Sequence, residues 1–177
     1  MSQNAQDEPV DDELDLEYPW QDYDDEDDDD GDYETIDLGP WIEPKEWVPP
    51  IGTDVSRDFA LLATTVALIG PVEGPTSLWF FLVEPSGALS PLIVPFDGLP
   101  RNPEPLLVDR LVHGLGDELT GAVPGSELVL ALVRAAGGDR GTVERSWSEA
   151  LRRAATSRPV PLREILAVGA DRARFLR

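Results

Sequence analysis

The carboxylate-rich run "DYDDEDDDDGDYETID", residues 22–37, holds the residue types of this chain best suited to binding a metal ion. Counted from Glu26, acidic residues occupy positions 1, 3 and 5, Gly31 occupies position 6 and Asp37 occupies position 12, which approximates a calcium loop. A calcium loop starts with Asp and ends with a bidentate Glu, whereas here the two are exchanged. No helical pattern flanks the run, so we expect no specific calcium site.

Nucleophilic catalysis would need a base, and His113 is the only histidine. It lies within an amphipathic pattern, and the chain has no GxSxG turn to present a serine. The glycines of "HGLGDELTG" and "AAGGDRGT" match neither the dinucleotide fingerprint nor the phosphate-binding loop. We therefore expect a partly packed or surface histidine, no catalytic residues, no metal and no cofactor.

Negative charge is concentrated at the start of the chain. Residues 1–50 hold 20 Asp and Glu against one basic residue, Lys45, which gives a net charge of −19. Residues 51–177 hold 15 acidic residues against 13 arginines, a net charge of −2. Such an acidic block repels itself and buries too little apolar surface to offset its chain entropy. We interpret residues 1–50 as a largely disordered arm.

Proline and tryptophan cluster where the arm ends, in "LGPWIEPKEWVPP", residues 38–50. The prolines favour an extended backbone there. Trp41 and Trp47 have two interpretations: they fold back onto the following domain, or they form a docking motif for a partner.

Residues 51–177 are rich in Leu, Val and Ala and are numerous enough for one hydrophobic core. The chain has no cysteine, which excludes disulfides and thiolate sites. Its first ten residues lack the basic and apolar regions of a secretory signal, and the longest apolar run, residues 59–70, is too short to cross a bilayer. We expect a cytoplasmic protein.

Periodicity predicts the elements that would position any site. In the first half we expect a short helix over residues 56–70, a hairpin of strands Ser77–Val83 and 89–96 around "EPSG", and a helix over residues 102–121. Asn102 is the expected N-cap of that helix, Pro103 its first residue and Gly121 its end. Its apolar stripe consists of Leu107, Leu111, Leu115 and Leu119.

The sequence after residue 121 predicts a central strand in "SELVLALVRA", a helix over residues 142–156 and a strand–turn–strand unit over residues 161–176. Thr142 is the expected N-cap of the helix. Its apolar face consists of Val143, Trp147, Leu151 and Ala154. The order helix, strand, strand, helix, strand, helix, strand, strand predicts an α/β fold: a mixed sheet sandwich covered by helices.

Arginines make the C-terminal part locally basic; they are Arg152, Arg153, Arg158, Arg172, Arg174 and Arg177. A nucleic-acid patch is one interpretation, but the attached −19 arm would compete with phosphate for it. A docking surface for the arm is another. We favour an ordinary charged face, and expect no direct nucleic-acid or membrane partner.

Residues 127–176 resemble the JAB/MPN family, particularly its bacterial RadC-like branch. In that family a strand delivers an HxHP motif, a loop follows, an SxxD motif opens a helix and a strand pair closes the unit. The order strand, Gly-rich loop, helix and strand pair is the same here.

The family's metal ligands are absent from the matching positions. With Thr142 at the family's Ser, Arg145 stands at the Asp, Arg134 at the Pro, and Val133 and Ala131 at the two histidines. Neither apolar residue can bind zinc, and Arg145 would repel the ion. The resemblance therefore implies a degenerate relative that keeps the scaffold without the metal.

Two classes of function remain open. The first is a non-catalytic protein interaction module whose acidic arm binds a basic partner surface, such as that of a nucleic-acid-binding protein. The second is a nucleic-acid mimic whose carboxylates replace phosphates; a cryptic hydrolase comes third. The residues expected to contact the partner are Asp27, Asp28, Asp29, Asp30, Tyr33, Ile36, Trp41 and Trp47.

Because residues 1–37 lack apolar periodicity, we expect sharp, poorly dispersed amide signals for them in NMR spectra. Their removal should leave the melting temperature almost unchanged. A loss of more than a few degrees would show that they belong to the fold.

Overall fold

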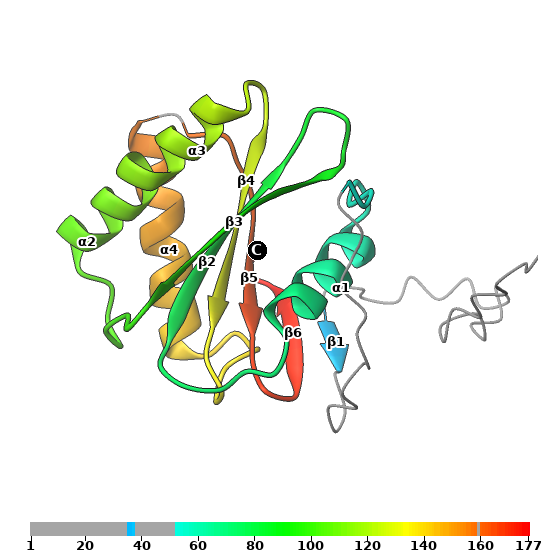
Figure 1. The fold of residues 1–177 in the computed structure, drawn as a ribbon. Helices are drawn as coiled ribbons and strands as arrows, with labels where there is room; N and C mark the ends of the chain where they lie inside the picture. The colour runs from blue at the N-terminus through cyan, green and yellow to red at the C-terminus, as the bar shows by residue number, and fades with distance from the viewer. Residues whose placement is uncertain (1–34, 38–51, 159) are drawn as a thin grey trace, which may run out of the picture. The chain divides into compact units, whose positions relative to one another are not determined.

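A computed structural model describes residues 35–37, 52–158 and 160–177, all within one compact unit, Asp32–Arg177. The unit is a mixed α/β sheet with helices on both faces, as the sequence predicts (Figure 1). Its six strands follow the order β1-β6-β5-β4-β2-β3. They are β1 (Thr35–Asp37), β2 (Ser77–Val83), β3 (Leu89–Asp97), β4 (Glu127–Val133), β5 (Leu162–Val168) and β6 (Arg172–Phe175).

The central strand β4 lies between β2 and β5. It pairs antiparallel with β2 and parallel with β5, and the other adjacent pairs are antiparallel. Its sequence "ELVLALV" is apolar on both faces, as expected of a strand that must be covered on both sides. The parallel pair needs a crossover connection, which helix α4 (Thr142–Ser157) provides.

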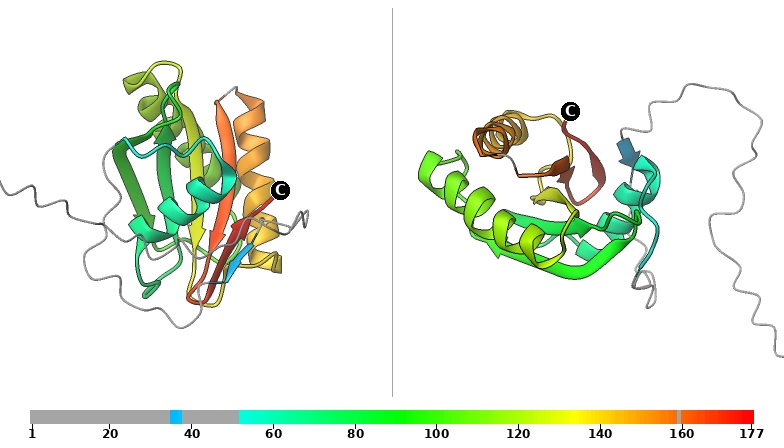
Figure 2. Two further views of the ribbon diagram at one scale, coloured as in Figure 1. Left: turned by 90° about the vertical axis from the view of Figure 1, so that its right-hand side faces the viewer. Right: turned by 90° about the horizontal axis from the view of Figure 1, so that it is seen from above.

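The helices are divided unequally between the two faces of the sheet (Figure 2). One face packs against two helical units: α4, and a continuous unit made of α2 (Pro105–Asp109), the π-helical turn η1 (Arg110–Leu115) and α3 (Gly116–Ala122). The other face packs against one helix, α1 (Asp58–Ile69). Alternation along each strand separates the two cores.

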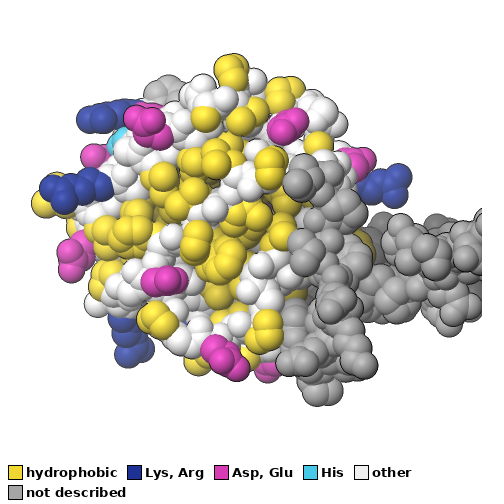
Figure 3. Space-filling model, in the orientation of Figure 1, with side chains coloured by type: hydrophobic (Ala, Val, Ile, Leu, Met, Phe, Trp, Pro, Cys, Tyr) yellow, Lys and Arg dark blue, Asp and Glu magenta, His cyan; other side chains and the backbone are white. Residues whose placement is uncertain are grey.

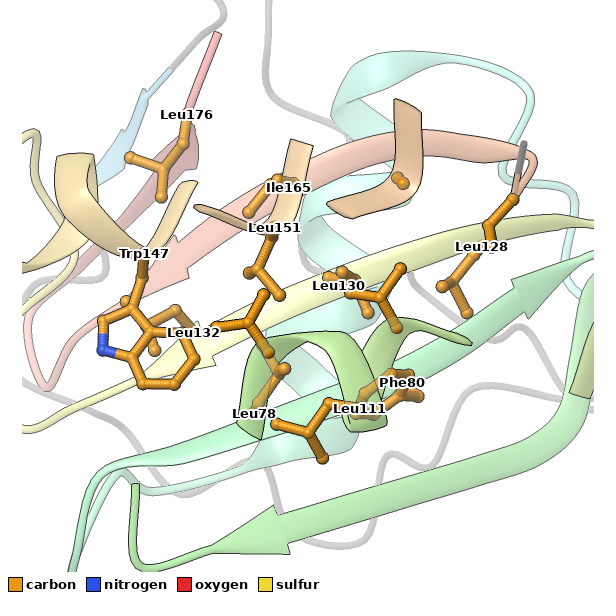
Figure 4. Close-up of a cluster of buried hydrophobic side chains, with 14 of the residues drawn as sticks. Leu78, Phe80, Leu111, Leu128, Leu130, Leu132, Trp147, Leu151, Ile165 and Leu176 are labelled. Carbon is orange, nitrogen blue, oxygen red and sulfur yellow. The ribbon is translucent and has the colours of Figure 1, made fainter. Parts of the chain in front are cut away.

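The larger core lies under α4 and the α2–α3 unit, and Figure 4 shows its labelled side chains converging between the helices and the sheet. Strand β4 contributes Leu128, Leu130 and Leu132, all facing this side. From α4, the indole of Trp147 is fully buried and its Nε1 donates a hydrogen bond to the carbonyl of Pro100, 3.2 Å away. This bond satisfies the only polar atom of the buried ring.

The expected hairpin and C-terminal strand pair are confirmed, but three expected helix boundaries are wrong. Helix α2 begins at Pro105 with Glu104 as its N-cap, rather than with Asn102 and Pro103, because Pro105 takes the first helical position. Gly121 lies inside α3, one residue before its end. Thr142 is the first residue of α4, and Gly141 is its N-cap.

Strand β1 was not predicted, and for residues 35–37 it shows that the interpretation as part of a disordered arm is wrong. Its residues lie within the acidic stretch, and they pair with β6 through the register Thr35–Arg174, Ile36–Ala173 and Asp37–Arg172. Three residues are too few to give a periodic signal, so only pairing with β6 distinguishes them from their neighbours.

Trp147→Ala should lower the free energy of unfolding by about 3–5 kcal/mol, because it removes a fully buried indole and leaves a cavity. Urea denaturation monitored by circular dichroism measures this loss. Leu106→Ala is the matched control, since Leu106 is 77 % exposed and its truncation should change stability by less than about 0.5 kcal/mol. A loss below about 1 kcal/mol for Trp147→Ala would contradict the assigned core.

Candidate binding surface

The side of β2 and β3 that faces away from α2, α3 and α4 is apolar and only partly covered. We call it the outer face; it consists of Val72, Trp79, Pro91, Ile93 and Pro95. Pairing aligns Trp79 with Pro95 and Phe81 with Ile93, so these side chains share one surface. Figure 3 shows hydrophobic side chains gathered in the middle of this view.

Trp79 is held in a defined position on the outer face. Its indole Nε1 donates a hydrogen bond to Ser77 Oγ at 3.1 Å. Its ring stacks on buried Phe81, with centroids 6.1 Å apart and planes inclined by 17°. A half-buried, fixed aromatic ring offers contact area with little entropy left to lose on binding.

The edge strand β3 is apolar on both of its faces. Leu92 and Phe96 are 37 % and 38 % exposed, and Phe96 lies opposite Leu78, on the side of the larger core. Pro91 and Pro95 interrupt the strand and supply no backbone N–H. Prolines of this kind prevent an edge strand from recruiting another strand, so β3 exposes side chains while resisting backbone pairing.

The elements that build the outer face carry acidic residues and no basic ones. Residues 58–100 contain no Lys, Arg or His. Their charged residues are Asp58, Glu73, Glu84 and Asp97. Asp97 pairs with Ser77 and therefore points to the same side as Trp79, while exposed Glu73 follows Val72 directly. Cationic side chains in Figure 3 lie near the margins.

A second candidate site is the loop that follows β4 and leads into α4. Arg134, at its start, donates from Nε to Glu144 Oε1 at 3.1 Å, and its Nη2 contacts the same oxygen. The Glu144 side chain is 1 % exposed, and its other oxygen, Oε2, has no hydrogen-bond partner in the described part of the chain. This ion pair joins the end of the central strand to the start of the helix.

The glycines of this loop allow close packing against the turn between β5 and β6. Gly138 has a φ of +83°, and a Cβ there would overlap the backbone of Arg172. Both loops line an open hollow of about 310 Å³, which also includes Asp139 and Asp171. The hydrogen bond from Arg172 lowers the pKa of Asp171. No group of three or more His, Cys, Asp or Glu suited to a metal occurs among the described residues.

His113 is more buried than the sequence suggests, with 6 % exposure. Its Nε2 donates to the Ala154 carbonyl at 2.9 Å, which ties the π-helical turn to α4. Its Nδ1 lies 2.8 Å from Asp109 Oδ1, close enough for an ion pair but not aligned as a hydrogen bond. The side chain therefore packs between helices rather than facing the hollow or the outer face.

Most residues predicted to contact a partner lie outside the described residues: Asp27, Asp28, Asp29, Asp30, Tyr33, Trp41 and Trp47. The acidic run tested as a calcium loop also lies there, apart from β1. Ile36 is placed by its backbone in β1, opposite Ala173. The outer face was not predicted, and the signal that the sequence offered for it was the absence of basic residues from residues 58–100.

The positions aligned with the JAB/MPN metal site have different roles here. Ala131 and Val133 are buried in the core beneath α1. Arg134 binds Glu144, whereas Thr142 and Arg145 are exposed at the start of α4.

Several C-terminal arginines make contacts within the domain. Arg177 binds Asp58, contacts Glu164 at 3.4 Å and lies 4.7 Å from the ring centre of Phe175. The hydrogen bond to Asp58 raises the pKa of Arg177. Arg152 donates to the Leu176 carbonyl at 2.7 Å. These contacts join the C-terminal strand to α1 and α4.

No family model, curated protein or solved structure matches this chain. Within the described ranges, no helix is both long and apolar enough to span a bilayer.

Arg134→Ala should destabilise the domain by about 3 kcal/mol or more, because it leaves the buried Glu144 carboxylate without its counter-ion. Glu144→Gln should cost less, about 1–2 kcal/mol, since the amide oxygen still accepts from Arg134. Urea titration compares the two variants. Arg153→Ala, at an exposed position of the same helix, is the control, and an equal effect of Arg153→Ala and Arg134→Ala would rule out a structural role for the ion pair.

Proposed function

We propose that this protein is a non-catalytic protein–protein interaction module. The observation that carries the proposal is the outer face of β2 and β3, where Trp79, Ile93 and two prolines form an apolar surface that α1 leaves partly open. Contiguous exposed apolar surface of this kind is typical of protein interaction sites. Burying it against a partner supplies the favourable free energy of association.

The acidic N-terminal segment, residues 1–50, would add electrostatic attraction between this protein and its partner. Its net charge of −19 favours a partner with a basic surface and speeds the encounter between the two proteins. Asp27, Asp28, Asp29 and Asp30 form its densest run of charge. Nearby Tyr33, Ile36, Trp41 and Trp47 would add apolar contacts that orient the bound partner, because charge alone discriminates poorly between partners.

A nucleic-acid mimic is the less favoured alternative. A mimic must display carboxylates at fixed spacing on a rigid surface, as phosphates are displayed on a duplex. Residues 51–177 are nearly balanced, with 15 acidic residues and 13 arginines, so the folded elements offer little excess charge for such a display. The apolar outer face also has no counterpart in a phosphate backbone.

The JAB/MPN resemblance is compatible with this proposal as a shared scaffold put to a different use. The buried Ala131 and Val133 offer no zinc ligands. A binding function needs only the sheet and helices that such a scaffold supplies.

Changing Asp27, Asp28, Asp29 and Asp30 together to Asn should lower the association rate constant for the partner several-fold at low salt. The partner is first isolated with the full-length protein as bait, and rates are then measured by surface plasmon resonance. The difference should nearly vanish near 1 M salt, where the Debye length is about 3 Å. Equal rates for both proteins at low salt would leave this acidic run without a role in binding.

A further inference from the structure

We propose that the outer face binds an amphipathic, basic helix of a partner protein, with Trp79 as the central contact. The inference rests on the proposed interaction function and assigns the partner's chemistry at that surface. It follows from three features of the described domain. The helices cover the two faces of the sheet unequally, prolines in the edge strand β3 oppose pairing with another strand, and the charged residues near the outer face are acidic.

The helix cover leaves room for one more helix. Six strands spaced about 4.8 Å apart make a sheet roughly 24 Å wide, enough for two helices about 10 Å apart on each face. Among the described residues, one face has two helical units, α4 and the α2–α3 unit, whereas the other has one helix, α1. Trp79 and Ile93 occupy the part of that face beside α1, partly exposed. A bound helix would complete the layer there.

The edge strand determines how the partner is held. Pro91 and Pro95 remove two backbone donors from β3, so adding a strand along this edge would leave partner carbonyls unpaired. A helix satisfies its own backbone hydrogen bonds and needs only side-chain contacts. An apolar stripe with spacing i, i+3, i+4 and i+7 would lie across Trp79, Ile93 and Pro95.

Charge determines which helix fits. Residues 58–100, which form α1, β2 and β3, contain four acidic and no basic residues, and one of the four, Asp58, is paired with Arg177. Asp97 and Glu73 lie next to the apolar surface, so lysines and arginines flanking the partner's stripe would meet opposite charge. A second copy of this chain would present the same acidic residues, and the repulsion disfavours a symmetric dimer through this face.

The test uses the full-length protein and a synthetic probe. The probe is a fluorescent peptide of about 18 residues, roughly 27 Å of helix, with leucines on one stripe and lysines elsewhere. A scrambled isomer of the same composition, which has no stripe, measures attraction by charge alone. Fluorescence anisotropy near 150 mM salt, where the Debye length is about 8 Å, gives both dissociation constants. We expect the striped peptide to bind about 10-fold more tightly than its isomer, or better.

Variants locate the binding site. Trp79→Ala should abolish the preference for the striped peptide, and Ile93→Asn should do the same if Trp79→Ala fails to fold as judged by circular dichroism. Leu106→Ala, at an exposed position of α2, should leave the preference unchanged. Changing Asp27, Asp28, Asp29 and Asp30 to Asn should weaken the binding of both peptides by the same factor. Loss of the acidic run and loss of the outer face therefore give different results.

Four outcomes would overturn the inference. The first is equal affinity of the wild type for both peptides, and the second is a preference that survives in every folded variant of Trp79 and Ile93. The third is a preference that appears only when Trp41 and Trp47 are changed to Ala, which would mean that the chain's own junction covers the outer face. The fourth is a dimer in sedimentation experiments that Trp79→Ala dissociates.

Discussion

The structure depends on the need to cover strand β4 on both of its faces. The residues of "ELVLALV" after Glu127 are buried, with Leu128, Leu130 and Leu132 on one side and Val129, Ala131 and Val133 on the other. A strand that is apolar on both sides must lie inside a sheet, with helices above and below it. The flanking strands β2 and β5 and the helices of both layers supply this cover.

Much of this architecture could be predicted from the sequence, because periodicity and turn residues are local signals. The hairpin around "EPSG", the strand pair around Gly169 and the amphipathic face of α4 were all correctly placed. The N-caps were misplaced by one or two residues because Asn102 and Thr142 are good capping residues that the chain does not use as caps. In each case a neighbouring Pro105 or Gly141 determines the boundary.

The candidate binding surface could not be predicted in the same way. Strand β2 reads "SLWFFLV", in which nothing distinguishes Trp79, half-buried, from Phe80 and Phe81, both fully buried. Phe80 faces the larger core, whereas Trp79 and Phe81 lie on the opposite side of the strand, so their different burial depends on how far along β2 that side is covered. In composition the more conspicuous feature is the carboxylates of residues 22–37, most of which lie outside the described residues.

Charge is distributed differently in the contacts that hold the domain together and in the surfaces proposed to bind a partner. Within the domain, acids and bases nearly balance, and arginines such as Arg134, Arg152 and Arg177 are used in contacts that join strands to helices. The stretch that builds the outer face has no basic residue available for such internal pairing. Asp58 is paired with Arg177 from the C-terminus, whereas Glu73, Glu84 and Asp97 carry charge of the same sign as the carboxylates of residues 1–50. A basic partner would be attracted by both and then held by burial of the apolar surface around Trp79, so charge would control the rate of encounter and burial the lifetime of the complex.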